Sequence, residues 1–180
     1  MNASQTLKKA VLQRTDEIDT DGYHQTIMNI MYEQWQKEDT MSYNDILNWF
    51  ETTYGSLAKF AVLIGKYNQQ VCNGGHIQYF HNGYADGEGG FMSDHDPSSP
   101  LHSELISLYH KAAIGDDYLI HEVYSILQDF EIELDEDQEI ENLSYLNDID
   151  RRYFHVTDPF INRLEHYIEM KIQETDDEQP

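Results

Sequence analysis

Cysteine and histidine side chains in the middle of the sequence are the first candidates for chemistry. Cys72 lies close to His76, and such a pair could act as a nucleophile and its base. However, a lone cysteine on the apolar side of a helix end is usually inert packing. It is also the single cysteine of the chain, which excludes an intrachain disulfide and a thiolate zinc site. We therefore expect Cys72 to be an inert packing residue on the apolar side of the helix.

Histidines and aspartates further along could suggest a metal site. The candidates are His76, His81, His95 and His102, with Asp94 and Asp96. His95 and His102 are separated by two prolines and do not have the i, i+4 spacing of a helical metal pair. No HExxH, P-loop, dinucleotide-binding or G-x-S-x-G motif occurs. With 34 carboxylates in the chain, accidental acid pairs are near certain and do not indicate a hydrolase. The sequence therefore predicts no metal site, no cofactor and no enzymatic activity.

Acidic residues dominate the composition. The chain has 34 Asp and Glu against 11 Lys and Arg, a net charge of -23 over 180 residues. Residues 67–150 hold 18 of these acids and one base, a net charge of -17, whereas a surface that is charged for solubility normally mixes both signs. Duplex DNA has about one charge per 1.7 Å of axis, so this net charge corresponds to roughly 39 Å of duplex. A domain of this length is about 40 Å across. The charge per length is therefore of DNA magnitude.

The densest acidic stretch runs from residue 112 to 150, which contains no Lys or Arg. Its acids are the candidate partner-binding residues: Asp116, Asp117, Glu122, Asp129, Glu131, Glu133, Asp135, Glu136, Asp137, Glu139, Glu141, Asp148 and Asp150. Carboxylates placed like phosphates would attract a basic DNA-binding protein and occupy its DNA site. The sequence thus predicts an acidic DNA mimic that does not bind nucleic acid itself.

The elements that must position these acids are predicted to be helices. Apolar residues recur at helical spacing along the chain, and alternating strand-like runs are missing apart from residues 130–134. The 13 Tyr, 7 Phe and 2 Trp argue against a disordered acidic chain. We predict an all-α fold, a single irregular globular domain of about seven to nine helices over residues 1–173, followed by an acidic tail at 174–180. No segment resembles a signal peptide or a membrane span, so we expect a cytoplasmic protein without membrane contact.

Several helix boundaries can be predicted from capping residues. Ser4, Asp21 and Ser42 are suitable N-caps for the first helices of the chain. Thr157-Asp158-Pro159 is predicted to open the last helix, because proline suits the first helical turn. The glycine-rich residues 83–100 are predicted to form a long loop, a type of segment that is often functional.

The sharpest local pattern is a predicted corner between two helices. Asn73-Gly74 follows an apolar helical run and supplies residues that tolerate positive φ at a helix end. A second, short helix is predicted to start at Gly75 and to stop at Asn82-Gly83. Gln78 and Asn82 lie four residues apart, so their amides share one face. We interpret the corner as structural, with amides bonded to loop backbone and aromatic residues in the core; an amide-lined ligand pocket is the alternative.

The corner also carries a family resemblance. Its residues are Asn73, Gly74, Gly75, Gln78, Tyr79, Phe80 and Asn82. They resemble the NGG-x-x-QYF-x-N signature of the bacterial DNA-mimic-protein family. The segment from Leu143 to Phe154 and the helix opened by Asp158-Pro159 resemble later segments of that family, so the likeness covers roughly residues 67–172.

The resemblance implies a function and a partner. Members of this kind would bind a helix-turn-helix transcription factor as a homodimer, block its DNA binding and so regulate transcription. The second hypothesis is a small ligand-binding protein or enzyme that uses the Asn73–Asn82 corner and the loop at 83–100.

Overall fold

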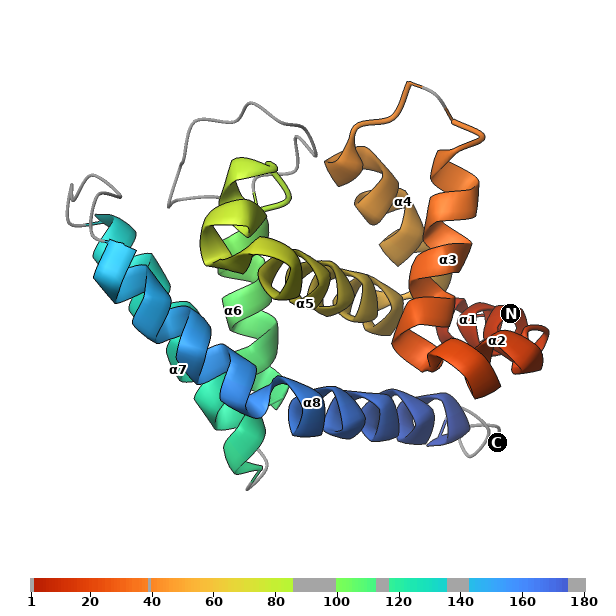
Figure 1. Cartoon of the computed structure of the whole chain (residues 1–180). Helices are drawn as coiled ribbons and strands as arrows, with labels where there is room; N and C mark the ends of the chain where they lie inside the picture. The colour runs from red at the N-terminus through yellow and green to blue at the C-terminus, as the bar shows by residue number, and fades with distance from the viewer. Residues whose placement is uncertain (1, 39, 86–99, 113–116, 136–142, 175–180) are drawn as a thin grey trace. The chain divides into compact units, whose positions relative to one another are not determined.

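The computed structural model describes residues 2–38, 40–85, 100–112, 117–135 and 143–174 (Figure 1). Within these residues all regular structure is helical. The helices are α1 (Ala3–Leu12), α2 (Thr15–Asp21), α3 (Tyr23–Trp35), α4 (Tyr43–Tyr54), α5 (Ser56–His81), α6 (Pro100–Ala112), α7 (Tyr118–Asp135) and α8 (Leu143–Glu174). The predicted all-α fold is confirmed, and the eight helices of the described residues fall within the predicted number. No helix of this described part is long and apolar enough to cross a membrane.

The chain divides into two units that share two helices. The first unit is Met1–Gly65 with Asn162–Pro180, and the second is Lys66–Ile161. Therefore α5 and α8 each contribute one part to each unit. In the first unit α1 packs against α3 and α4, and in the second α6 packs against α7. The prediction of a single domain over 1–173 stays a prediction.

Of the three N-caps predicted in the first unit, one is correct and two are wrong. Ser42 caps α4 as predicted, with its hydroxyl accepting from the Asp45 N–H at 3.1 Å. The predicted cap Ser4 lies inside α1, and Asn2 is the actual cap, because its side chain forms a capping box with Gln5. The prediction for Asp21 is also wrong, since this residue ends α2 and does not start α3.

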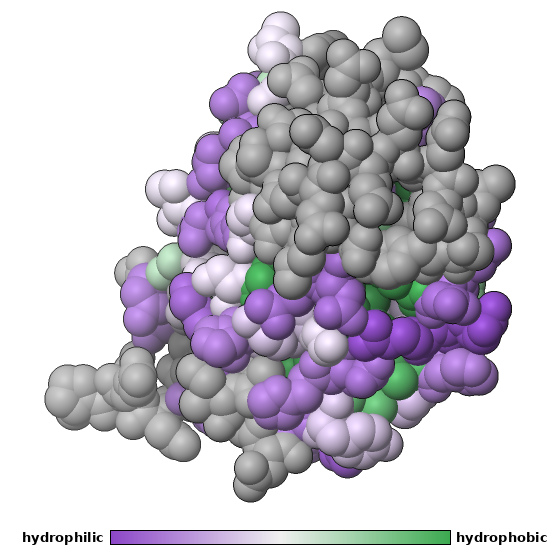
Figure 2. Space-filling view, turned by 90° about the vertical axis from the view of Figure 1, so that its left-hand side faces the viewer, coloured by the Kyte–Doolittle hydropathy of each residue, from purple (hydrophilic) through white to green (hydrophobic). Residues whose placement is uncertain are grey.

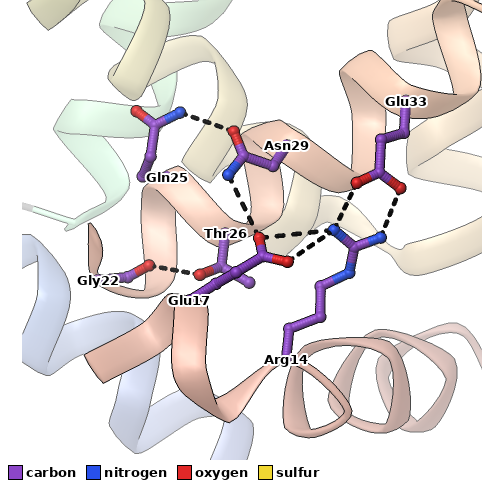
Figure 3. Close-up of polar contacts among 7 residues, drawn as sticks. All are labelled: Arg14, Glu17, Gly22, Gln25, Thr26, Asn29 and Glu33. Atoms are coloured by element: carbon purple, nitrogen blue, oxygen red, sulfur yellow. Dashed lines mark hydrogen bonds and ion pairs between the residues drawn. The ribbon is translucent and has the colours of Figure 1, made fainter. Parts of the chain in front are cut away.

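A polar network fastens α2 to α3 in the first unit (Figure 3). The Arg14 guanidinium lies 2.7 and 2.6 Å from the two carboxylate oxygens of Glu33, and 3.1 Å from Glu17. Asn29 donates to the same Glu17 carboxylate at 3.3 Å. The forked contact with Glu33 is the geometry in which arginine binds carboxylates most strongly. Two acids of this unit thereby share one arginine within the fold.

Helix α8 is continuous across Pro159, so the predicted helix start at Asp158-Pro159 is wrong. Proline lacks an N–H and normally breaks a helix interior. Here the buried apolar residues stay in helical phase on both sides of it, and burial of that continuous stripe favours one helix. These buried residues are Ile149, Tyr153, Phe160, Leu164, Ile168 and Ile172.

Candidate functional site

The kink in α5 is the predicted corner. Helical geometry stops after residue 73 and resumes at residue 76, which confirms the predicted helix stop and restart. The positive φ lies at Gly75 (φ 76°, ψ -178°), whereas Gly74 has φ -165°, which any residue can adopt. The prediction that Gly74 supplies the positive φ is therefore wrong. The conformation of Gly75 is essentially restricted to glycine.

A carboxylate from α8 holds this kink in the second unit. Asp150 Oδ1 accepts from the backbone N–H of His76 at 3.0 Å and from its ring Nδ1 at 2.5 Å. A Cβ on Gly75 would lie 2.3 Å from Asp150 Oδ2. Glycine is thus required both for the backbone conformation and for the approach of this carboxylate. The two sequence segments with the clearest family resemblance meet at this contact.

His76 continues the contact into the core. Its Nε2 lies 2.7 Å from the Tyr67 hydroxyl, and both side chains are buried. Burial lowers the pKa of His76 although Asp150 counteracts it, and burial raises the pKa of Tyr67 well above its usual value. The neutral imidazole donates a hydrogen bond from Nδ1 to Asp150, and its Nε2 accepts a hydrogen bond from the Tyr67 hydroxyl. A buried hydroxyl with a raised pKa does not suit nucleophilic chemistry.

Aromatic rings surround His76 on its other side. The imidazole stacks on Phe130 with 5.1 Å between ring centroids, and Phe130 stacks on Phe80 at 4.8 Å. His102 meets the edge of Phe80 in the same cluster, and burial lowers its pKa to about 3. The prediction that the aromatic residues of the corner lie in the core is confirmed, since Tyr79 and Phe80 are buried.

The amides of the corner bind one another. Gln78 and Asn82 both donate to Gln70 Oε1, at 3.1 and 2.7 Å, which confirms that they share a face. The predicted partner, loop backbone, is wrong: the acceptor is a side chain eight and twelve positions earlier on α5. The kink brings Gln70 within reach of both amides. These amide groups are thus used within the fold.

Cys72 is exposed, so the prediction that it lies on the apolar side is wrong. Its sulfur lies 3.5 Å from Asn68 Oδ1, an atom that also accepts from the hydroxyls of Tyr153 at 2.7 Å and Thr157 at 2.8 Å. Partial burial raises the pKa of the Cys72 thiol. The thiol form is therefore favoured, which does not suit a nucleophile.

The structure describes the side chains of only some predicted partner-binding acids. Those described are Asp117, Glu122, Asp129, Asp148 and Asp150. The side chains of the others lie outside the described part: Asp116, Glu131, Glu133, Asp135, Glu136, Asp137, Glu139 and Glu141. The backbone of α7 nevertheless extends to Asp135. The loop predicted at 83–100 also falls largely outside the described residues.

Three of the described acids have an arginine opposite them. Arg152 on α8 contacts Glu122 at 3.1 Å and Asp129 at 2.6 Å, both on α7. Arg151 contacts Asp148 at 3.1 Å. Asp117 instead accepts from the Leu119 N–H at the start of α7. The sequence analysis missed the role of Arg152, because its partners lie 30 and 23 positions earlier.

A surface hollow of about 580 Å³ lies along the first half of α8. Its lining residues are Asn147, Asp150, Arg151, Phe154 and His155, one stripe of the helix. Figure 2 shows a face on which the described residues are mainly hydrophilic and apolar residues appear only in small patches. Phe154 in the hollow is one of the large apolar residues of the described part that are exposed, with 49% of its surface accessible.

Comparisons with known proteins add no family to these observations. No family model, curated protein or solved structure matches the chain. The resemblance to the DNA-mimic-protein family stays a prediction. Within the described residues no three His, Cys, Asp or Glu side chains are placed to hold a metal ion; of the histidines and aspartates considered for a metal site, Asp94, His95 and Asp96 lie outside these residues.

Proposed function

We propose that this protein is a non-enzymatic DNA mimic that occupies the DNA-binding site of a basic transcription factor. The observation that supports the proposal is the uneven charge: residues 67–150 hold 18 acids and one base. A field of one sign accelerates encounter with a basic partner and releases its bound ions, as DNA does. The proposed partner is a helix-turn-helix protein, the proposed form a homodimer and the proposed location the cytoplasm.

Ion pairs within the fold reduce the number of acids that would contact the partner. Glu122 and Asp129 share Arg152, and Asp148 is paired with Arg151. These three acids are therefore less available to a partner. Residues 131–141 contain seven acids and no Lys or Arg. We therefore place the main contact at this stretch, which starts in the last turns of α7.

The number of acids per length at the end of α7 is close to that of phosphates along one DNA strand, although acids two residues apart project from different sides of a helix. Acids occupy positions 131, 133 and 135, every second residue at the end of the helix. With a rise of 1.5 Å per residue, one charge falls on about 3 Å of helix axis. One DNA strand has a charge about every 3.4 Å. The linear charge density of this helix end thus supports mimicry.

The test reverses Asp135, Glu136 and Asp137 to Lys and measures binding to the partner. That partner is first captured from lysate with the intact chain and identified by its release with duplex DNA. We expect at least a tenfold loss of affinity, about 1.4 kcal/mol, with an unchanged helical circular dichroism signal. Single exposed ion pairs contribute only about 0.2–1 kcal/mol, so a cluster is needed.

The control reverses Asp19, Asp21 and Glu38, three exposed acids of the first unit, and changes the net charge equally. This variant should retain most of the affinity of the parent protein. Parent binding should also weaken steeply with salt and exclude duplex DNA. A ternary complex with DNA, or an affinity that is indifferent to salt, would contradict the proposal.

A further inference from the structure

The hollow on α8 combines a carboxylate, an amide and an aromatic ring. Asp150 and Phe154 lie one helical turn apart, and Asn147 lies one turn before Asp150. Residues with this spacing share one face of the helix, so a single ligand group can reach them together. A hollow of about 580 Å³ is large enough for one long side chain.

Asp150 is fixed in position by its hydrogen bonds to His76. Its Oδ1 accepts both hydrogen bonds from His76, whereas Oδ2 has no hydrogen-bond partner among the described residues. His76 is buried and its pKa is lowered, so it binds Asp150 as a neutral donor. This distinguishes Asp150 from Glu122, Asp129 and Asp148, which face arginines. A carboxylate held in this way is pre-organised for an external cation.

Phe154 provides the second half of the site. A half-exposed aromatic ring beside a carboxylate favours a guanidinium group, which stacks on ring faces and bonds planar acceptors. Arg151, which also lines the hollow, is already paired with Asp148 at 3.1 Å. We propose that the hollow binds one arginine side chain of the basic partner, with Asp150 as counter-ion and Phe154 as stacking surface. This inference rests on the proposed function and assigns a specific anchor to it.

The first experiment uses N-acetyl-arginine methylamide as the probe and the full chain as the target. We expect amide NMR signals of residues 147–155 to shift in a saturable way. The citrulline analogue, equal in shape but neutral, should leave them unchanged. Phe154→Ala should remove the shifts, while Met170→Ala, which truncates another exposed apolar residue of α8, should retain them. Shifts spread evenly over all acidic segments would overturn the proposal.

The second experiment measures affinity for the captured partner. Phe154→Ala and Asp150→Asn should each weaken binding about threefold to fivefold, the range for an exposed cation–π contact or ion pair. Phe154→Tyr should restore binding, because the ring remains. Arg151→Gln should strengthen it, because a competing cation is removed. Phe154 is exposed, so its variants keep the proposal testable even if Asp150→Asn unfolds the protein.

The two proposals fail differently. If charge reversal at 135–137 abolishes partner binding while the Phe154 and Arg151 variants behave like the parent, the arginine site is refuted and mimicry stands. If neither set of variants changes partner binding, the proposed function fails as well.

Discussion

In each of the two units, a carboxylate of helix α8 caps the start of another helix. Both of these caps, called closures below, combine a carboxylate, a histidine and a glycine. In the first unit Glu165 accepts from the backbone N–H groups of Tyr23 and His24 at the start of α3. In the second unit Asp150 accepts from the N–H of His76 after the α5 kink. Each carboxylate also contacts ring Nδ1 of the histidine. Each start follows a glycine with positive φ, Gly22 at 85° or Gly75 at 76°.

The two closures differ in burial. The His24 side chain is 14% exposed and Glu165 is 22% exposed, whereas the His76 side chain is completely buried. Burial alone would raise the pKa of Glu165, but the contacts with His24 outweigh it and lower that pKa. In the second unit burial outweighs Asp150 and lowers the pKa of His76. The same arrangement is therefore a partly solvated cap in one unit and a buried neutral network in the other.

The largest effect is expected from Gly75→Ala. The new Cβ would lie 2.3 Å from Asp150 Oδ2 and would force an alanine to φ 76°. We expect a loss of at least about 3 kcal/mol in the free energy of unfolding, from backbone strain and the displaced carboxylate together. Urea unfolding followed by circular dichroism measures it.

Two other glycines calibrate this result. Gly22→Ala has a similar backbone cost, but its Cβ would lie 2.9 Å from the end of the Glu165 side chain, which is flexible. We therefore expect a smaller loss in the free energy of unfolding. At Gly74 the nearest atoms to a new Cβ all belong to the Gln78 side chain, which can move, so Gly74→Ala should cost about 1 kcal/mol, the contribution of one hydrogen bond. Equal losses at Gly74 and Gly75 would contradict the assignment of strain to Gly75.

The second prediction concerns pH. The pKa of His102 is lowered to about 3, while a histidine in the unfolded chain titrates near about 6.5. Below that value the unfolded state binds the proton first, so the contribution of His102 to the free energy of unfolding falls as the pH is lowered. His102 alone should lower the free energy of unfolding by about 2 kcal/mol between pH 7.5 and pH 5. The lowered pKa of His76 changes stability in the same direction. The contribution of Glu165 is lost only below its unfolded pKa of about 4.5.

Urea unfolding at pH 7.5, 6 and 5 tests this difference between the units. His102→Phe should reduce the loss over this range by about 2 kcal/mol, because the residue no longer titrates. If the variant loses as much stability as the parent, buried neutral His102 is not its source.

The smallest effect is expected from removing one hydroxyl of the buried network. Tyr67→Phe leaves His76 Nε2 buried without its donor and should cost about 1–2 kcal/mol. Tyr153→Phe is the matched control, because its acceptor, Asn68 Oδ1, keeps the Thr157 hydroxyl at 2.8 Å. We expect Tyr153→Phe to lose less stability than Tyr67→Phe, measured by thermal unfolding. The reverse order would show that the His76–Tyr67 bond is not what distinguishes the second unit.

The sequence alone determined what depends on local spacing. Helical periodicity predicted the all-α fold, Ser42 predicted a cap, and the Asn73–Asn82 pattern predicted a kink with Gln78 and Asn82 on one face. Each of these follows from neighbours within a few positions, where backbone geometry fixes the relation between side chains. The charge of residues 67–150 is likewise a property of the sequence.

Tertiary structure decided which groups those local features meet. The cap of α3 is Glu165, over 140 positions away, and not the neighbouring Asp21. The strained glycine is Gly75 and not Gly74, because Asp150 approaches from α8. Arg152 pairs with both Glu122 and Asp129, a contact that the sequence does not reveal. Only packing brings such distant groups together, since a carboxylate takes whichever donor or cation the fold places within hydrogen-bond distance.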